Sequence, residues 1–345
     1  MTRTLLALPF AVLALACVEP DPATLGATEQ EAGCNMWGCG TNSPILGPFN
    51  MYELNENGPN LDGITITDLI LNGQSYRVDV QGARLVAIPL SGTGTLSGTR
   101  LIGARIRLST SAGPAVIHIE NVTPRGQLFW RGPVGYVETY ELKYTGAGMP
   151  NFGGPIPLCL TAPSTASGEG PQWAQPYEAI LYTGDRYNSI AKTVTASSYA
   201  ASGNYFNIAC AGGALAKLHL NRYTTASSVS GYTSTAATRQ AMLKMYTGDV
   251  CGSGVAYTMQ GTSLKWTNAA GQSSSGGGTT SNEAMWTAAG ASCIQTHRLH
   301  NTPNSMDNLI TCAPWNGGAL PYCAGLPLSQ IPADLAFLTQ SAAIP

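Results

Sequence analysis

The chain has 345 residues, a formal net charge of −2 at pH 7 and a pI of about 6.1, and only 10% of its residues are charged. This length allows one large domain or two smaller ones, each with its own core. The near-neutral charge excludes the basic surface that nucleic-acid binding requires, so we expect no nucleic-acid partner. A surface so poor in charge is typical of exported proteins rich in strands and loops.

Residues 1–16 predict a secretory signal peptide. They carry one basic residue and an apolar run, which is shorter than the ~20 residues of a membrane-spanning helix. The run ends in Ala-Leu-Ala-Cys at residues 14–17, which leaves two processing routes open. Ala-Leu-Ala fits an ordinary signal peptidase, whereas Leu-Ala-Cys resembles a bacterial lipobox in which Cys17 becomes lipidated.

The cysteine count favours the lipid anchor at Cys17. The chain has 9 cysteines, and without Cys17 an even set remains, which permits complete pairing in an oxidising compartment. A free thiol at an exported N-terminus would be reactive. We therefore expect a membrane-anchored lipoprotein of the bacterial cell envelope, at the outer membrane, with plain secretion as the alternative. The disulfide candidates are Cys34, Cys39, Cys159, Cys210, Cys251, Cys293, Cys312 and Cys323.

Residues 17–58 predict an acidic tether that contains a small cysteine loop. The stretch after Cys17 is acidic and lacks aromatic residues and any apolar period, which is typical of a disordered linker. The spacing of Cys34 and Cys39 suits a local disulfide. Half of a metal knuckle is the alternative, but no second close pair of cysteines completes it. We expect neither a metal nor a cofactor.

Residues 59–160 predict a β-rich domain. Apolar and polar residues alternate around Asn72-Gly73, a strong hairpin signal. Further short strands follow, which favours a β-sandwich or a partly open barrel. Leu96, Leu101 and Ile106 are spaced five apart, but so few repeats favour a ladder of hairpins over a solenoid. His118 lies in an alternating run, where a strand-surface histidine is commoner than a metal ligand or a base.

A linker at residues 161–172 separates this domain from an α+β domain at 173–325, and residues 326–345 form a C-terminal tail. Two apolar faces predict helices in the second domain. The first face comprises Ile208, Ala211, Leu215 and Leu218, and the second comprises Ala237, Ala241, Met242 and Met245, with Gly248 ending that helix. The overall fold class is therefore α+β, with a β-rich N-terminal domain followed by a disulfide-braced α+β domain.

Asp249 is the candidate site residue. It follows the helix that ends at Gly248, where the helix dipole disfavours a negative charge. A structural interpretation gives it backbone N–H donors in the turn, or an ion pair with Lys217 or Arg239. A functional interpretation makes it a general acid or base.

Residues 239–266 resemble the ADYC-domain family of bacterial lipoproteins, named for an Ala-Asp-Tyr-Cys segment. Here residues 248–251 read Gly-Asp-Val-Cys, so the acid at Asp249 and the sulfur at Cys251 match. The resemblance extends over most of the mature chain. It implies a signal, a lipid anchor, a β-rich front and a cysteine-braced rear domain, and it implies no particular activity.

The pairing of the cysteines stays open at this point. A bridge between Cys210 and Cys251 would join the two predicted helices. Cys293, Cys312 and Cys323 would tie down the C-terminal end.

Enzyme signatures are weak. No G-x-S-x-G motif occurs, and paired cysteines leave no thiolate nucleophile. His297 and His300 lack an evident third zinc ligand nearby. A glycosidase needs two carboxylates across a cleft, and no spacing pairs those of the rear domain, which are Glu178, Asp185, Asp249, Glu283 and Asp307.

The 15 tyrosines and 6 tryptophans suggest stacking on a glycan or contacts with a surface protein, although packing in the core accounts for most aromatic residues. We therefore expect a binding or structural protein of the cell envelope, attached to the membrane by its N-terminal lipid. The alternative is an envelope hydrolase that acts on glycan or peptide, with Asp249 as its acid or base.

Overall fold

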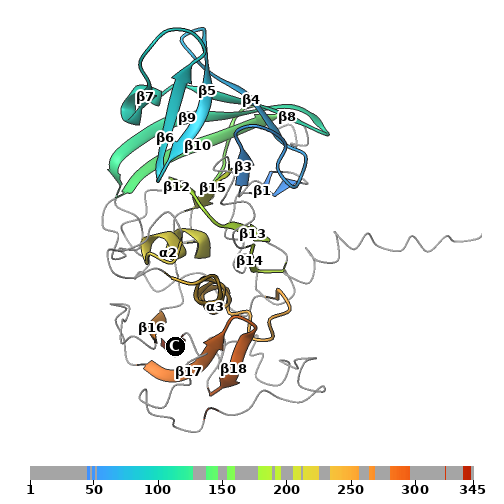
Figure 1. Ribbon diagram of the computed structural model, residues 1–345, viewed down its shortest axis with the longest axis vertical. Helices are drawn as coiled ribbons and strands as arrows, with labels where there is room; N and C mark the ends of the chain where they lie inside the picture. The colour runs from blue at the N-terminus through green and yellow to red at the C-terminus, as the bar shows by residue number, and fades with distance from the viewer. Residues whose placement is uncertain are drawn as a thin grey trace, which may run out of the picture.

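The computed structural model arranges the molecule in three parts along its long axis (Figure 1). A large sheet lies at one end, two helices lie in the middle, and a four-stranded sheet lies at the other end. The described residues are 45–46, 49–50, 53–126, 137–146, 154–159, 178–188, 191–195, 205–210, 213–224, 234–255, 264–268, 280–295, 323 and 337–342.

The large sheet has 11 strands, every neighbouring pair of which is antiparallel. In spatial order they are β3 (Glu53–Asn55), β15 (Tyr205–Cys210), β12 (Glu178–Thr183), β10 (Val137–Gly146), β9 (Gly113–Gly126), β8 (Arg105–Thr110), β4 (Thr65–Leu71), β5 (Gln74–Gln81), β6 (Arg84–Pro89) and β7 (Leu96–Ser97), and β11 (Ile156–Pro157) pairs with β10. The predicted β-rich architecture is confirmed.

Local sequence explains most of these strands. In β8 and β9 every second residue is buried, so Ile106 and Ile117 face each other in the core while polar neighbours point outward. Asn72 and Gly73 both have positive φ, 52° and 78°. They form the two-residue turn that joins β4 to β5, as the sequence predicts. Leu101 ends a short 3-10 helix, η1 (Gly98–Leu101), rather than a solenoid coil.

The sheet curls until strands far apart in its order approach each other, but it does not close. The Thr183 N–H donates to the Gly82 carbonyl at 3.0 Å. The Leu85 N–H donates to the Tyr140 hydroxyl at 2.8 Å, and the Val80 N–H donates to Glu56 Oε1 at 2.9 Å. Where these distant strands approach each other, single hydrogen bonds connect them and no continuous strand pairing joins them among the described residues. The partly open barrel, one of the two expected forms, describes this sheet.

The sheet extends beyond the expected domain boundary. The predicted linker at 161–172 lies outside the described residues, but β12 and β15 on its far side belong to the large sheet. Their alternate residues Leu181 and Ile208 enter the same apolar core as Ile117. A strand can join a sheet from any distance along the chain, so a composition shift alone does not mark the edge of a core.

The helices are α2 (Ala214–Leu220) and α3 (Ala236–Thr247). The predicted second helix is confirmed: the Thr235 hydroxyl accepts from the Thr238 N–H, and Gly248 ends α3 with φ 65°. Ala237 is exposed, so the prediction that it lies on the buried face of this helix was wrong. The first predicted helix started too early, because Ile208 lies in β15, where pairing with β12 uses its backbone hydrogen bonds.

The other strands form smaller sheets. β1 (Ile45–Leu46) pairs with β2 (Phe49–Asn50), and β13 (Arg186–Asn188) pairs with β14 (Thr193–Thr195). The four-stranded sheet has the order β16 (Leu264–Asn268), β19 (Phe337–Ala342), β17 (Thr280–Thr287) and β18 (Gly290–Ile294). β19 lies within the stretch expected to be a tail, yet it occupies the middle of this sheet. Within the described residues, no helix is both long and apolar enough to cross a membrane.

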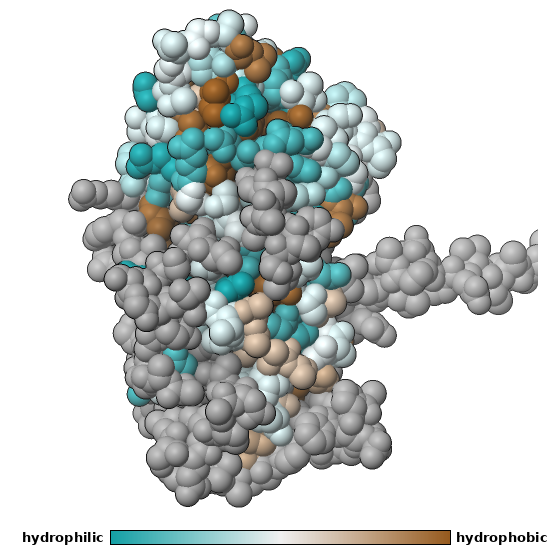
Figure 2. Space-filling model, in the orientation of Figure 1, coloured by the Kyte–Doolittle hydropathy of each residue, from teal (hydrophilic) through white to brown (hydrophobic). Residues whose placement is uncertain are grey.

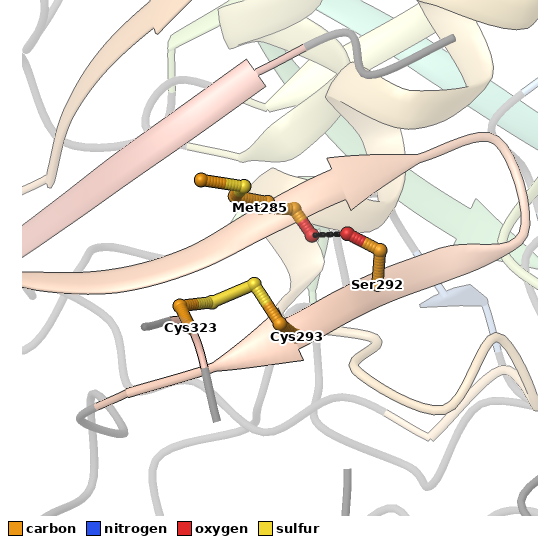
Figure 3. Close-up of a disulfide and its surroundings, with 4 residues drawn as sticks. All are labelled: Met285, Ser292, Cys293 and Cys323. Atoms are coloured by element: carbon orange, nitrogen blue, oxygen red, sulfur yellow. Dashed lines mark hydrogen bonds between the residues drawn. A yellow bond between two sulfur atoms is a disulfide. The ribbon is translucent and has the colours of Figure 1, made fainter. Parts of the chain in front are cut away.

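Two disulfides are placed by the structure. Cys159 is bonded to Cys210, and Cys293 is bonded to Cys323 (Figure 3). The suggested bridge between Cys210 and Cys251 is therefore wrong, because Cys210, at the end of β15, is bonded to Cys159. Cys251 is disulfide-bonded as well.

The other candidate cysteines, Cys17, Cys34, Cys39 and Cys312, lie outside the described residues.

On the face shown in Figure 2, apolar residues lie among polar ones over the large sheet. Among the side chains whose exposure is described, the exposed large apolar ones are Leu61, Leu90 and Ile102.

Candidate functional site

Asp249 stands at the second position after the end of α3. Gly248 adopts the left-handed conformation, and its N–H donates to the Met245 carbonyl at 3.2 Å. The Asp249 N–H donates to the Lys244 carbonyl at 2.9 Å. This pair of bonds is a Schellman motif, which brings the side chain of residue 249 back over that of residue 244. An apolar contact usually occupies that place, and here an ion pair does.

The Asp249 carboxylate is fully buried and has two donors on one oxygen. Lys244 Nζ forms an ion pair with Oδ2, and the Gly254 N–H donates to the same atom at 2.9 Å. The expected backbone donor is therefore present. The two expected ion-pair partners are wrong, because Lys217 lies over the Tyr246 ring and Arg239 pairs with a different carboxylate.

Lys244 connects three segments through one ammonium group. Besides Asp249, its Nζ donates to the carbonyl oxygen of Ala191 at 2.8 Å and to that of Gly252 at 3.3 Å. Gln240 lies one helical turn earlier on the same face of α3, and its Nε2 donates to the Lys192 carbonyl at 2.8 Å. The face of α3 that carries both residues therefore holds the β13–β14 connection.

Burial sets the electrostatics of this cluster. Loss of hydration raises the pKa of Asp249, and the nearby Lys244 ammonium opposes that shift. Burial also lowers the pKa of Lys192 to about 8, opposed by the charge of Asp249. Asp249 Oδ1 has no hydrogen-bond partner among the described residues. The positive charges of Lys244 and Lys192 favour the ionised form of the Asp249 carboxylate. The anion that these two lysines stabilise is therefore a side chain of the same chain.

The 248–254 turn packs directly on the turn between β17 and β18. The Ala291 N–H donates to the Val250 carbonyl at 2.9 Å. A Cβ on Gly252 would lie 1.8 Å from the Ala289 carbonyl oxygen, and one on Gly290 would lie 2.7 Å from the Val250 oxygen. No side chain fits between the two backbones, so glycine is required at both positions.

Two further buried ion pairs lie between the large sheet and α3. Arg186 in β13 pairs with Glu53 in β3. Arg239 in α3 donates from Nη2 to Asp185 Oδ1 at 2.9 Å, and Asn207 in β15 donates to the Asp185 carbonyl at 2.8 Å. The first pair joins β13 to the large sheet and the second joins α3 to the segment before β13, and every charged group in them is buried.

The candidate carboxylates are brought into the interior and not to a common surface. The exposed fractions of Glu178, Asp185, Asp249 and Glu283 are 5%, 1%, 0% and 3%. Asp307 lies outside the described residues. Burial raises the pKa of Glu178 to about 7, partly offset by the Thr139 hydroxyl, which donates to Oε1 at 3.0 Å. The two carboxylates facing a cleft that a glycosidase needs do not occur among these four.

His118 is half-buried on the outer side of β9, as the alternation predicts. Its Nε2 lies 2.8 Å from the Thr145 hydroxyl oxygen, and burial lowers its pKa, helped by the neighbouring charge of Arg105. His297 and His300 fall outside the described residues. Within the described ranges, no three His, Cys, Asp or Glu side chains gather as a metal site would require.

Sequence reasoning missed Lys244, Lys192 and Gly252. One signal was available, because Gly248 at the helix end predicts a Schellman motif, and that motif places residue 249 over residue 244. The position of Lys192 depends on how the β13–β14 connection meets α3, which no local pattern reports.

An open antiparallel sheet joined to a disulfide-braced layer of helices and strands is the class of protein that this fold defines. The family described as ADYC domain matches residues 98–300, from η1 to just beyond β18. The match covers more than half of the chain, which therefore belongs to the ADYC domain family. No curated protein and no solved structure matches the chain.

Proposed function

We propose that this ADYC domain protein is an exported, lipid-anchored protein of the bacterial cell envelope, and that its role there is structural or in binding. The N-terminal apolar run ending at Cys17 supports export and anchoring. The disulfides Cys159–Cys210 and Cys293–Cys323 support an oxidising compartment, because such bridges are rare in a reducing cytosol.

The observation that carries the non-catalytic role is the complete burial of Asp249. Its carboxylate contacts Lys244 and Gly254 of the same chain, so the acid of the family-naming segment is used for internal contacts. A general acid must come within hydrogen-bond reach of its substrate. The alternative of an envelope hydrolase with Asp249 as acid or base is disfavoured for this reason.

The aromatic residues favour the structural role over glycan stacking. Among the aromatic side chains whose exposure is described, Tyr205 alone is not buried, and Arg186 covers it with its Cζ 3.9 Å from the ring centroid. A sugar stacks on an accessible ring, which these residues do not provide. Within the described residues the aromatic side chains therefore serve packing, which supports the structural role.

The first experiment separates a structural Asp249 from a catalytic one. We expect Asp249→Asn to lose about 3–5 kcal/mol in the free energy of unfolding and to expose its disulfides to mild reductant, because Lys244 then keeps a buried charge without its counter-ion. Glu120→Gln, at an exposed acid of β9, is the control and should leave both unchanged. A folded Asp249→Asn protein that has lost a hydrolytic activity of the wild type on cell-wall extracts would overturn the proposal.

The second experiment tests the anchor. We expect the intact mass of the membrane-extracted protein to show a chain that starts at Cys17 with added acyl groups, and Cys17→Ser to move the protein to the soluble fraction. An unmodified chain beginning at another residue would contradict lipidation and leave plain secretion.

A further inference from the structure

The four-stranded sheet is completed by a strand from the far end of the chain. β19 pairs with β16 on one side, with Trp266 opposite Thr339, and with β17 on the other, with Met285 opposite Leu338. β19 also lies beyond residue 300, where the family match ends.

β16 depends on this one strand for its place in the sheet. Among the described residues β16 pairs with β19 and with no other strand. Without β19, both β16 and β17 would expose a row of unpaired backbone N–H and C=O groups. The slot between them accepts a strand with the register of β19. Such a strand comes from the same chain or from a second copy of it.

One covalent bond decides how tightly β19 is tethered to its own sheet. Cys293 lies in β18, and its disulfide holds Cys323 at the edge of the sheet, where the Cys323 N–H donates to the Ile294 carbonyl at 3.2 Å (Figure 3). Only residues 324–336 then connect this anchor to β19. With the disulfide broken, the connection runs over residues 295–336.

Shortening this connection raises the local concentration of β19 at its own slot. The effective concentration of a tethered segment falls roughly as the −3/2 power of the tether length, which gives about sixfold between these two tethers. The shorter tether also reaches at most about 45 Å when fully extended, whereas the longer one reaches a neighbouring molecule freely.

We propose that the Cys293–Cys323 disulfide keeps β19 in its own sheet, and that its reduction lets β19 enter the slot of a second copy, so that two chains form a strand-exchanged dimer. An external dithiol supplies the two electrons and two protons. The S–S bond becomes two thiols, and the dithiol is oxidised to its own disulfide. The partner is a second copy of this chain, because only β19 brings the matching register. This inference does not depend on the proposed envelope role.

The test compares two disulfides of the same full-length chain. The variant Cys293→Ser/Cys323→Ser and the matched control Cys159→Ser/Cys210→Ser are unfolded in urea, refolded at high concentration and sized by chromatography with light scattering. We expect a dimer-to-monomer ratio about sixfold above wild type for the first variant and an unchanged ratio for the control. Equal ratios in all three proteins would overturn the proposal.

A cross-link distinguishes strand exchange from other association. Lys265 in β16 lies opposite Gln340 in β19. One copy of the serine variant carries Lys265→Cys and a second copy carries Gln340→Cys, and the mixture is refolded and treated with a short bismaleimide. A covalent heterodimer is expected, since β19 of one copy lies in the sheet of the other. Dimers without this cross-link would refute exchange.

A second variant covers the case in which the serines prevent folding. Met285, Cys293 and Cys323 form a small buried apolar cluster, so Cys293→Ala/Cys323→Val keeps apolar groups beside Met285. The same dimer ratio and cross-link are expected for it. A folded and strictly monomeric Ala/Val variant would refute the proposal.

Discussion

The large sheet and the region around α3 are held together by different forces. The core of the large sheet is made almost wholly of aliphatic and aromatic side chains from nine of its strands. The ion pairs between its strands, such as Lys143–Glu120, each include an exposed side chain. Around α3, three ion pairs are buried, among them Lys244–Asp249. The first region is stabilised by apolar burial, which tolerates small changes in shape.

The second region depends on matched partners. A buried charge that loses its counter-ion costs about 3–5 kcal/mol, whereas an exposed pair contributes about 0–1 kcal/mol. The α3 region therefore has a few positions of large effect, and the large sheet spreads its stability over many. The large sheet is therefore specified mainly by the alternation of apolar and polar residues, and the region around α3 by specific contacts between charged groups.

The strongest test of this contrast is Gly252→Ala. The new Cβ would lie 1.8 Å from the Ala289 carbonyl oxygen, at a residue whose φ is +71°. We expect a loss of more than about 4 kcal/mol in the free energy of unfolding, because two backbones must separate. Gly73→Ala is the control: its φ is +78° and no atom lies within 4 Å of its Cβ, so urea unfolding should show only about 1–2 kcal/mol.

Lys244→Met tests the buried ion pair itself. Removing the ammonium leaves Asp249 as an unpaired buried charge and leaves the Ala191 carbonyl without its donor. We expect a loss of about 3 kcal/mol in urea unfolding at pH 7. If Asp249→Leu is then added and restores none of that loss, the unpaired carboxylate is not its cause.

The raised pKa of Glu178 should give the stability of the protein a pH dependence of intermediate size. Its pKa is about 7 in the folded protein and 4.5 ordinarily, so the folded state binds the proton more tightly, and this contribution to stability is lost as pH rises from 4.5 to 7. The stability of Glu178→Gln relative to wild type should therefore increase by about 2 kcal/mol between pH 5 and pH 8, after allowance for solvent screening.

The quantity to measure is the difference in unfolding free energy between wild type and Glu178→Gln. The stability of either protein alone also changes with pH because of His219, whose effect has the opposite sign. Burial lowers the pKa of His219 to about 4, so its contribution is lost as pH falls below its ordinary value. Both proteins share that effect. An equal difference at pH 5 and pH 8 would show that Glu178 is ionised to the same extent in the folded and unfolded chains.

The smallest effect is expected on the outside of the large sheet. Lys143 Nζ lies 3.3 Å from Glu120 Oε2, and both side chains are partly exposed. Lys143→Ala should lower the free energy of unfolding by less than about 1 kcal/mol. A loss as large as that for Lys244→Met would erase the distinction between the two regions.

Local patterns in the sequence determined the elements that need only local information. The turn at Asn72-Gly73, the alternation around His118 and the end of α3 at Gly248 were all predicted, because each follows from backbone preferences and side-chain periodicity within a few residues. The family resemblance around Asp249 and Cys251 was likewise visible in the sequence and agrees with the match over residues 98–300.

Tertiary structure alone decided the partners. The choice of Lys244 for Asp249, of Cys159 for Cys210, and of β19 for the middle of the small sheet depends on which segments meet in space. Several lysines, cysteines and strands satisfy the same local chemistry. Packing selects among them, because the segments that meet in space bring one lysine to Asp249, one cysteine to Cys210 and one strand between β16 and β17.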